Sequence, residues 1–139
     1  MKPSSYAGKT EFTKGGELFF LRKVTGEVIC KIEIEISDDE NDSATGMMYR
    51  NDLDENQGML FILKEYSVRS FWMKNTVIPL DIIFADSSKK IIKIYKETKP
   101  LSEELLSSLK PANNIVEVNG GYCKRSGIME GDMISFLLN

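Results

Sequence analysis

Strict alternation of side chains between residues 28 and 36 constrains the fold of this chain more than any other feature. Every second residue is apolar, and the residues between them include Lys31, Glu33 and Glu35. A period of two places one set of side chains in a core and the other in water, as in a β-strand with one solvated face. Because such a strand needs neighbours, the pattern predicts a β-sheet. The apolar set consists of Val28, Cys30, Ile32, Ile34 and Ile36.

Seven other short runs have the apolar content of strands, and short turn-forming segments separate many of them. The sequence shows no repetition of strand, helix and strand, which favours antiparallel pairing. The predicted strands span residues 18–24, 28–36, 59–63, 68–74, 80–85, 91–95, 115–118 and 133–138.

Capping patterns predict short helices between some of these strands. Ser37 and Glu40 form a capping box for a helix that ends near Arg50. A second helix begins at Ser102 and stops before Pro111, and Asn119 caps a third. The sequence therefore predicts an α+β, β-rich fold. We expect a mostly antiparallel sheet, folded into a barrel-like or sandwich core, with two or three short helices.

Length and composition indicate one domain. The chain has 139 residues, of which 42% are hydrophobic and 28% charged, and this is ordinary globular composition. Residues 1–17 are rich in Gly, Ser, Lys and Thr and are predicted to form a flexible N-terminal arm. Residues 18–139 are predicted to form a single β-rich domain, which we expect to be a monomer.

The absence of histidine limits the chemistry open to the chain. It excludes Ser-His-Asp and Cys-His nucleophile systems. Two cysteines, Cys30 and Cys123, cannot by themselves form a structural zinc site, so no metal and no cofactor is predicted. The net charge of −3 argues against a nucleic-acid partner. No stretch is long and apolar enough to predict a membrane span.

One segment concentrates side chains that suit recognition. Trp72, the only tryptophan, lies near Lys74 and Asn75, and Asp81 follows shortly after. A flat apolar ring beside charged and amide groups is what the recognition of a saccharide or an anion needs. Alternatively, Trp72 fills a core, and Lys74 or Arg69 pairs with Asp81 to fix the turn.

The same segment carries a family resemblance. The chain resembles the bacterial and archaeal family called domain of unknown function 192 in four blocks that occur in the family's order. The blocks are residues 44–50 (ATGMMYR), 58–61 (GMLF), 69–84 (RSFWMKNTVIPLDIIF) and 116–121 (VEVNGG), the last leading to Gly127-Ile128 and Gly131-Asp132. They cover about residues 27–138. The family's motif residues map onto Arg50, Arg69, Trp72, Lys74, Asn75, Asp81 and Glu117.

The resemblance implies a compact β-rich fold with small helices, and no established activity comes with it. Members commonly carry an N-terminal export or membrane segment, which implies the cell envelope and a periplasmic or extracellular location. Residues 1–26 of this chain show no such segment, so a cytoplasmic location is the alternative.

The leading hypothesis is a non-catalytic binding or interaction module of the cell envelope. It would recognise a polar ligand, such as a glycan or an anionic group, or an envelope partner. Its site would consist of Trp72, Lys74, Asn75 and Asp81, with Arg50 and Arg69 nearby, and the family motif adds Glu117.

Two other hypotheses remain open. The first is a hydrolase or lyase that uses Asp81 or Glu117 as general base and Lys74 or Arg50 to stabilise an anion. It predicts that these groups converge in one pocket and that the pKa of one carboxyl group is raised. The second is that the motif residues only determine the fold. In that case Asp81 accepts hydrogen bonds from backbone amides and Lys74 lies at the surface.

Overall fold

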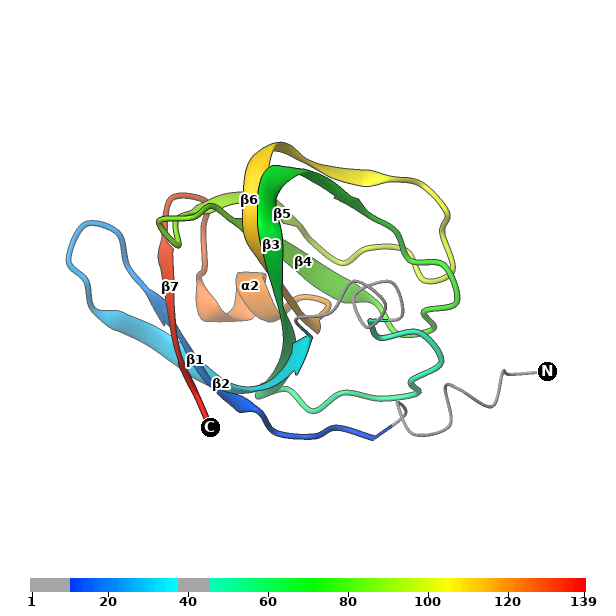
Figure 1. The fold of residues 1–139 in the computed structure, drawn as a ribbon. Helices are drawn as coiled ribbons and strands as arrows, with labels where there is room; N and C mark the ends of the chain where they lie inside the picture. Colours follow the sequence, from blue (N-terminus) through cyan, green and yellow to red (C-terminus); the bar gives the residue numbers. More distant parts are fainter. Residues whose placement is uncertain (1–10, 38–45) are drawn as a thin grey trace.

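The computed structural model describes residues 11–37 and 46–139 of the chain. Seven β-strands and one short helix form the regular structure of this part (Figure 1). The strands are β1 (Gly16–Leu21), β2 (Val28–Ser37), β3 (Gln57–Phe71), β4 (Leu80–Ala85), β5 (Ile91–Tyr95), β6 (Leu106–Asn119) and β7 (Met133–Leu138), and the helix is α2 (Tyr122–Ser126).

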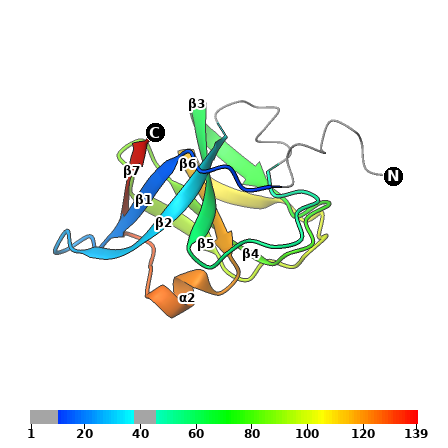
Figure 2. The same ribbon diagram turned by 90° about the horizontal axis from the view of Figure 1, so that it is seen from below.

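All seven strands join one curled sheet with the order β5-β4-β6-β3-β2-β1-β7. Every neighbouring pair is antiparallel except β2 and β3, which run parallel. The two ends of the sheet approach each other where Lys90 bridges to Met133 and the amide of Ile91 donates to the carbonyl of Asp132 at 2.8 Å. The sheet is therefore a mixed half-barrel, with α2 at one end of the curl (Figure 2).

Two apolar clusters lie on the two faces of this sheet, because alternate residues of each strand point to opposite sides. The first core contains the alternating isoleucines of β2 and packs against α2. The second core lies on the other face, and the short segment around Met47 packs on it. All six residues of β4 are buried, since both of its faces are covered. The first core includes Leu18, Phe20, Ile32, Ile34, Leu60, Ile83, Val116, Val118 and Tyr122, and the second includes Met47, Met59, Phe61, Met73, Leu80, Ile82, Phe84 and Ile115.

The β-rich character of the fold is confirmed, and several strands have the predicted bounds. β4, β5 and β7 coincide with the predicted runs, and β2 extends one residue further than predicted. The predicted strand 59–63 and residues 68–71 of the predicted strand 68–74 belong to one long strand, β3, which a register shift between Ile62 and Ser67 interrupts, whereas residues 72–74 lie beyond its end. β1 begins at Gly16, at the end of the segment that was expected to be an arm.

The predicted helix content is wrong, because the described residues contain one short helix and not two or three. Residues predicted to form the second helix belong partly to β6, where Leu106 pairs with Phe71 of β3. Ser102 does accept a hydrogen bond from the amide of Glu104, at 3.2 Å, but pairing with β3 draws the following chain into an extended form. A left-handed backbone at Leu109 lets the strand continue past Pro111 with a bulge.

The first predicted helix lies partly outside the described residues. Its residues 38–45 are not described, residues 46–49 form turns, and Ser37 ends β2. The third predicted helix is confirmed as α2, with Lys124 and Arg125 in its last turn and Gly127 after it. No helix among the described residues is long and apolar enough to cross a membrane.

Candidate functional site

The structure distributes the predicted site residues over four places, of which Arg69 on β3 is one. Asp81 lies in the joint between β4 and α2. Arg50 and Glu117 lie on the face of the second core. Trp72, Lys74 and Asn75 lie in the turn that follows β3. These residues therefore do not form one site.

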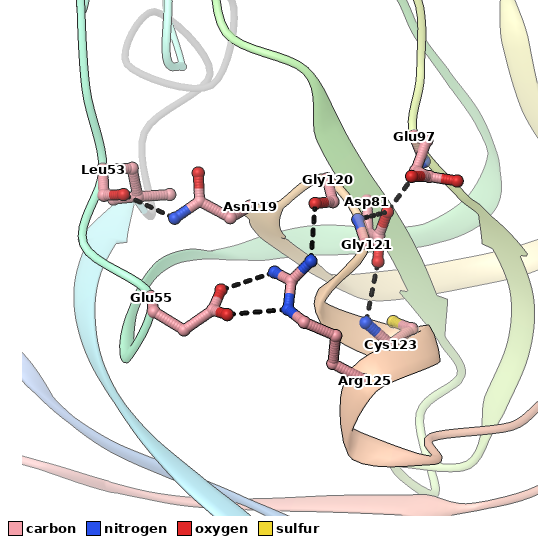
Figure 3. A network of polar contacts seen from close by, with 9 residues as sticks. All are labelled: Leu53, Glu55, Asp81, Glu97, Asn119, Gly120, Gly121, Cys123 and Arg125. Carbon is pink, nitrogen blue, oxygen red and sulfur yellow. Dashed lines mark hydrogen bonds and ion pairs between the residues drawn. The ribbon is translucent and has the colours of Figure 1, made fainter.

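Asp81 is fully buried, and its carboxylate accepts three backbone hydrogen bonds (Figure 3). Its Oδ1 accepts from the amides of Glu97, at 2.8 Å, and Gly121, at 3.0 Å, and its Oδ2 accepts from the amide of Cys123, at 2.8 Å. These amides belong to the chain after β5 and to the start of α2. Asp81 therefore ties three segments together, as the hypothesis of a fold-determining motif predicted.

Asp81 also caps α2, which Asn119 was predicted to do. The residue before the helix is Gly121, with φ of 90°, and a glycine has no side chain that could cap the helix. The side-chain amide of Asn119 instead donates to the carbonyl of Leu53 (Figure 3). Figure 3 also shows Arg125 of α2 in a two-pronged ion pair with Glu55, at 2.6 and 2.7 Å, on the surface beside this joint.

Arg50 is a buried arginine with a partly buried partner. Its two terminal nitrogens donate to the two carboxylate oxygens of Glu35, at 2.9 and 2.8 Å. Oε1 of Glu35 also accepts from the amide of Thr13, at 3.1 Å. Sequence reasoning did not select Glu35, although its place in the charged set of the alternating strand put it on the face opposite to the first core. Because Glu35 uses both terminal nitrogens of Arg50, this guanidinium has little left with which to bind an anion.

Glu117 lies in the same row of paired residues across the sheet as Glu35. The register places Glu35 of β2 beside Met59 of β3, Met59 beside Glu117 of β6, and Glu117 beside Ile82 of β4. Burial raises the pKa of Glu117 to about 8, and the positive charge of Arg50 opposes this shift only in part. The side chain is therefore mostly protonated at pH 7.

Three buried polar atoms on or beside this face have no hydrogen-bond partner within the part of the chain that the structure describes. They are Oε1 of Glu117, Nε of Arg50 and Oγ of Ser37. Buried polar groups are normally paired, so these three atoms are exceptions gathered on one face of the sheet.

Asp81 and Glu117 do not converge. Asp81 pairs in register with Val118, which belongs to the first core, and Glu117 pairs with Ile82, which belongs to the second core. Directly opposed residues share a face, so the two carboxylates point to opposite sides of the sheet. A single pocket that contains both, as the hydrolase or lyase hypothesis predicted, is not present.

The turn after β3 presents Trp72 and Lys74 together. Trp72 is 38% exposed, and the Lys74 ammonium lies 5.1 Å from the centre of its ring. Asn75 has a left-handed backbone, with φ of 57°, and its carbonyl accepts from the amide of Tyr49 at 2.9 Å. Met73, between them, is buried in the second core. The burial of Met73 and the hydrogen bond from Tyr49 thus fix the turn, while Trp72 and Lys74 face outward.

Arg69 does not join either group. Its backbone amide donates to Oγ of Ser108, at 2.9 Å, and its guanidinium donates to the carbonyl of Glu65. Asp81 has no ion pair with Arg69 or Lys74 among the described residues, so the alternative in which one of them pairs with Asp81 is not what fixes the turn. The described residues also contain no cluster of three carboxylate or thiol groups that is able to hold a metal.

The fold and these motif positions define a half-barrel domain of a class for which no activity is described. The sequence model of the family DUF192, described as an uncharacterized ACR, matches residues 21–136. The chain belongs to this family.

The solved structures that are similar to the chain include the following two. A protein from Sinorhizobium meliloti 1021, provisionally described as a transcription regulator, shares 32% identity with a TM-score of 0.83, over 91% of this chain and 97% of that one. A protein of unknown function from Novosphingobium aromaticivorans DSM 12444 shares 27% identity with a TM-score of 0.74, over 97% of this chain and 98% of that one. No curated protein matches the chain.

Proposed function

We propose that the chain is a non-catalytic binding module of the cell envelope, which recognises a polar ligand, a glycan or an anionic group, at the turn that carries Trp72, Lys74 and Asn75. The observation that carries the proposal is the exposed indole ring of Trp72 with the Lys74 ammonium beside it. An indole face provides a stacking platform for a sugar ring, and an ammonium provides charge and hydrogen-bond donors for an anion.

The setting of the turn supports recognition with little loss of conformational freedom. The amide of Met73 donates to the carbonyl of Ser102 at 3.0 Å, and the carbonyl of Thr76 accepts from the amide of Leu101 at 2.9 Å. The turn is thus joined to the loop before β6 on one side and to Tyr49 on the other. A pre-ordered site avoids part of the entropy cost of binding.

The proposal gives no role in contacting ligand to Asp81, whose three amide bonds occupy its carboxylate. It also gives none to Arg50, whose terminal nitrogens are bound to Glu35. Nucleic acid is not the ligand that we propose, because the chain has a net charge of −3.

Since Trp72 is the only tryptophan, its fluorescence reports on this turn alone. We expect a glycan array to identify ligands and titration of a hit to quench or shift the Trp72 emission. Lys74→Met should weaken binding of an anionic hit about tenfold. Lys93→Met is the matched control, since Lys93 lies 4.9 Å from the ring centre of Tyr95 in a similar contact on β5. Equal effects of the two substitutions, or no ligand for the wild-type protein, contradict the proposal.

One observation favours the alternative of a hydrolase or lyase, namely the raised pKa of Glu117. At pH 7 this side chain holds its proton, so it suits a general acid better than a general base. The alternative requires that Glu117→Gln abolish turnover of a substrate that the wild-type protein converts. Lys74→Met would then change turnover as well as binding.

A further inference from the structure

A chain of contacts joins the buried guanidinium of Arg50 to residues 72–75, which we call the ligand turn. At one end of this chain, Arg50 donates to the two carboxylate oxygens of Glu35, at 2.9 and 2.8 Å. At the other end, the amide of Tyr49, the residue before Arg50, donates to the carbonyl of Asn75 at 2.9 Å. A movement of the Arg50 side chain therefore reaches the ligand turn through a single hydrogen bond.

The hydrogen bond between Tyr49 and Asn75 joins two residues with unusual backbones. Tyr49 has φ of 66° and Asn75 has φ of 57°, and both values lie in the left-handed region that residues other than glycine rarely adopt. Such conformations persist only where the surrounding contacts enforce them. Arg50 follows Tyr49 directly, and its amide donates to the carbonyl of Met47 at 3.2 Å. The conformation of Tyr49 therefore depends on where the Arg50 side chain is anchored.

Glu117 is a second carboxyl group on which the charge of Arg50 acts. The register places Met59 between Glu35 and Glu117, so two strand spacings, about 10 Å, separate their backbones. Burial favours the protonated form of Glu117, and the positive charge of Arg50 favours the ionised form. Nε of Arg50 and Oε1 of Glu117 both lack a hydrogen-bond partner among the described residues. The guanidinium thus has a donor to spare for an ionised Glu117.

The other titratable groups near Glu117 have partners elsewhere or face away. Asp81, on the neighbouring strand β4, lies on the opposite side of the sheet. The hydroxyl of Tyr95 donates to a backbone carbonyl of β6 at 2.7 Å, and the carboxylate of Glu33 lies 3.5 Å from a lysine ammonium. A change of charge at Glu117 therefore acts first on Arg50.

We propose that the proton on Glu117 controls the order of the ligand turn through Arg50. When this proton passes to the solvent, the new carboxylate attracts the guanidinium, and its Nε–H turns toward Oε1. Arg50 then leaves its two-pronged contact with Glu35, Tyr49 loses its anchored neighbour, and the hydrogen bond to Asn75 weakens. Arg50 is thus a positioning residue for the ligand turn. The inference rests on the proposed function, because the site that it regulates is the one proposed above.

The test is acrylamide quenching of the Trp72 emission in the full chain, from about pH 6 to about pH 9, without any ligand. We expect the quenching constant of the wild-type protein to rise about twofold in one step with its midpoint near pH 8. Glu117→Gln should keep the low value throughout, because it has no proton to lose. Arg50→Met should keep the high value throughout. Arg125→Met, which removes an ion pair on the surface, is the control and should retain the wild-type step.

A second variant tests the link with Arg50 in place. Glu35→Gln removes the carboxylate that neutralises Arg50, so the positive charge acts more strongly on Glu117 and favours its ionised form. The midpoint of the quenching step should therefore move to lower pH by about one unit. Melting temperatures measured at each pH show that the variants remain folded.

Three results overturn the inference. They are the absence of a step in the wild-type protein, an unchanged step in Glu117→Gln, and an unchanged midpoint in Glu35→Gln. Each of them leaves the proposed function standing, because no ligand enters the measurement. A glycan array without a hit, in contrast, contradicts the proposed function and does not alter the quenching step.

Discussion

Asp81 and Glu117 are buried carboxyl groups on neighbouring strands, and their surroundings differ completely. Three backbone amides surround Asp81, which lies toward the first core. Glu117 lies toward the second core, with one unpartnered oxygen and a pKa of about 8. Both belong to the family's motif. The comparison teaches that one buried acid stabilises the fold through its hydrogen bonds and that the other is tolerated there mainly because it keeps its proton.

The largest effect is expected from removal of the Asp81 carboxylate. Asp81→Ala leaves three amides without an acceptor, two of them buried, and should lower the free energy of unfolding by about 4 kcal/mol. Urea denaturation followed by Trp72 fluorescence measures it. The control is Asp86→Ala in the turn between β4 and β5, where Asp86 also accepts two amide bonds but is partly exposed. A similar, small decrease of the unfolding free energy in both variants would show that Asp81 does not hold the three segments together.

The second effect concerns the ion pair between the buried Arg50 and the partly buried Glu35, beside Glu117. Arg50→Met removes the partner of Glu35 and the positive charge that opposes the pKa shift of Glu117, and should cost about 3 kcal/mol of unfolding free energy. Arg125→Met is the control, because Arg125 also makes a two-pronged ion pair, through Nε and one terminal nitrogen, with Glu55 on the surface. The control should cost less than about 1 kcal/mol. Equal costs would mean that burial adds nothing to the Arg50 pair.

The smallest effect, when it is taken per pH unit, is the pH dependence of the unfolding free energy that Glu117 contributes. Its pKa in the folded state, about 8, lies above its ordinary value of 4.5. The folded chain therefore binds more protons than the unfolded chain between these values. The stability contributed by Glu117 is complete below about pH 4.5, decreases as pH rises toward 8 and is lost above that pH.

Glu117→Gln removes this titration and keeps the shape of the side chain. The wild-type unfolding equilibrium should shift toward the unfolded state by up to about tenfold per pH unit between pH 5 and 8 relative to the variant. Chemical denaturation at several pH values measures the difference. If the unfolding free energies of the two proteins depend on pH in the same way, the raised pKa of Glu117 is contradicted and the contrast with Asp81 is lost.

Much of the sheet was predictable because alternation is a local signal. β2, β4, β5 and β7 follow from runs whose periodicity or apolar content leaves little choice. The error around Ser102 has a physical cause. Leu105, Leu106 and Leu109 have helical spacing, and only pairing with β3, a partner distant in sequence, makes Leu106 face the core and leaves the other two exposed.

The candidate site was predictable in composition but not in arrangement. The motif named Asp81 and Glu117 together, and only the register of β4 against β6 shows that they face opposite sides. The shared side of Trp72 and Lys74 followed from their spacing of two residues. Glu35, the partner of Arg50, was visible as a charged residue of β2. Arg50 lies in an irregular segment, however, and no pattern in the sequence predicts which strand residue such a segment contacts.

The pairing of β1 with β7 governs when the domain can form. Gly16 lies opposite Leu138, and the amide of Asn139 donates to the carbonyl of Gly15 at 2.9 Å, so the first described strand is completed by the last. During synthesis, β1 waits for nearly the whole chain before it gains this neighbour, and contacts between distant parts of a chain form slowly. The contact between β1 and β7 is therefore one of the last that this domain is able to complete as it folds.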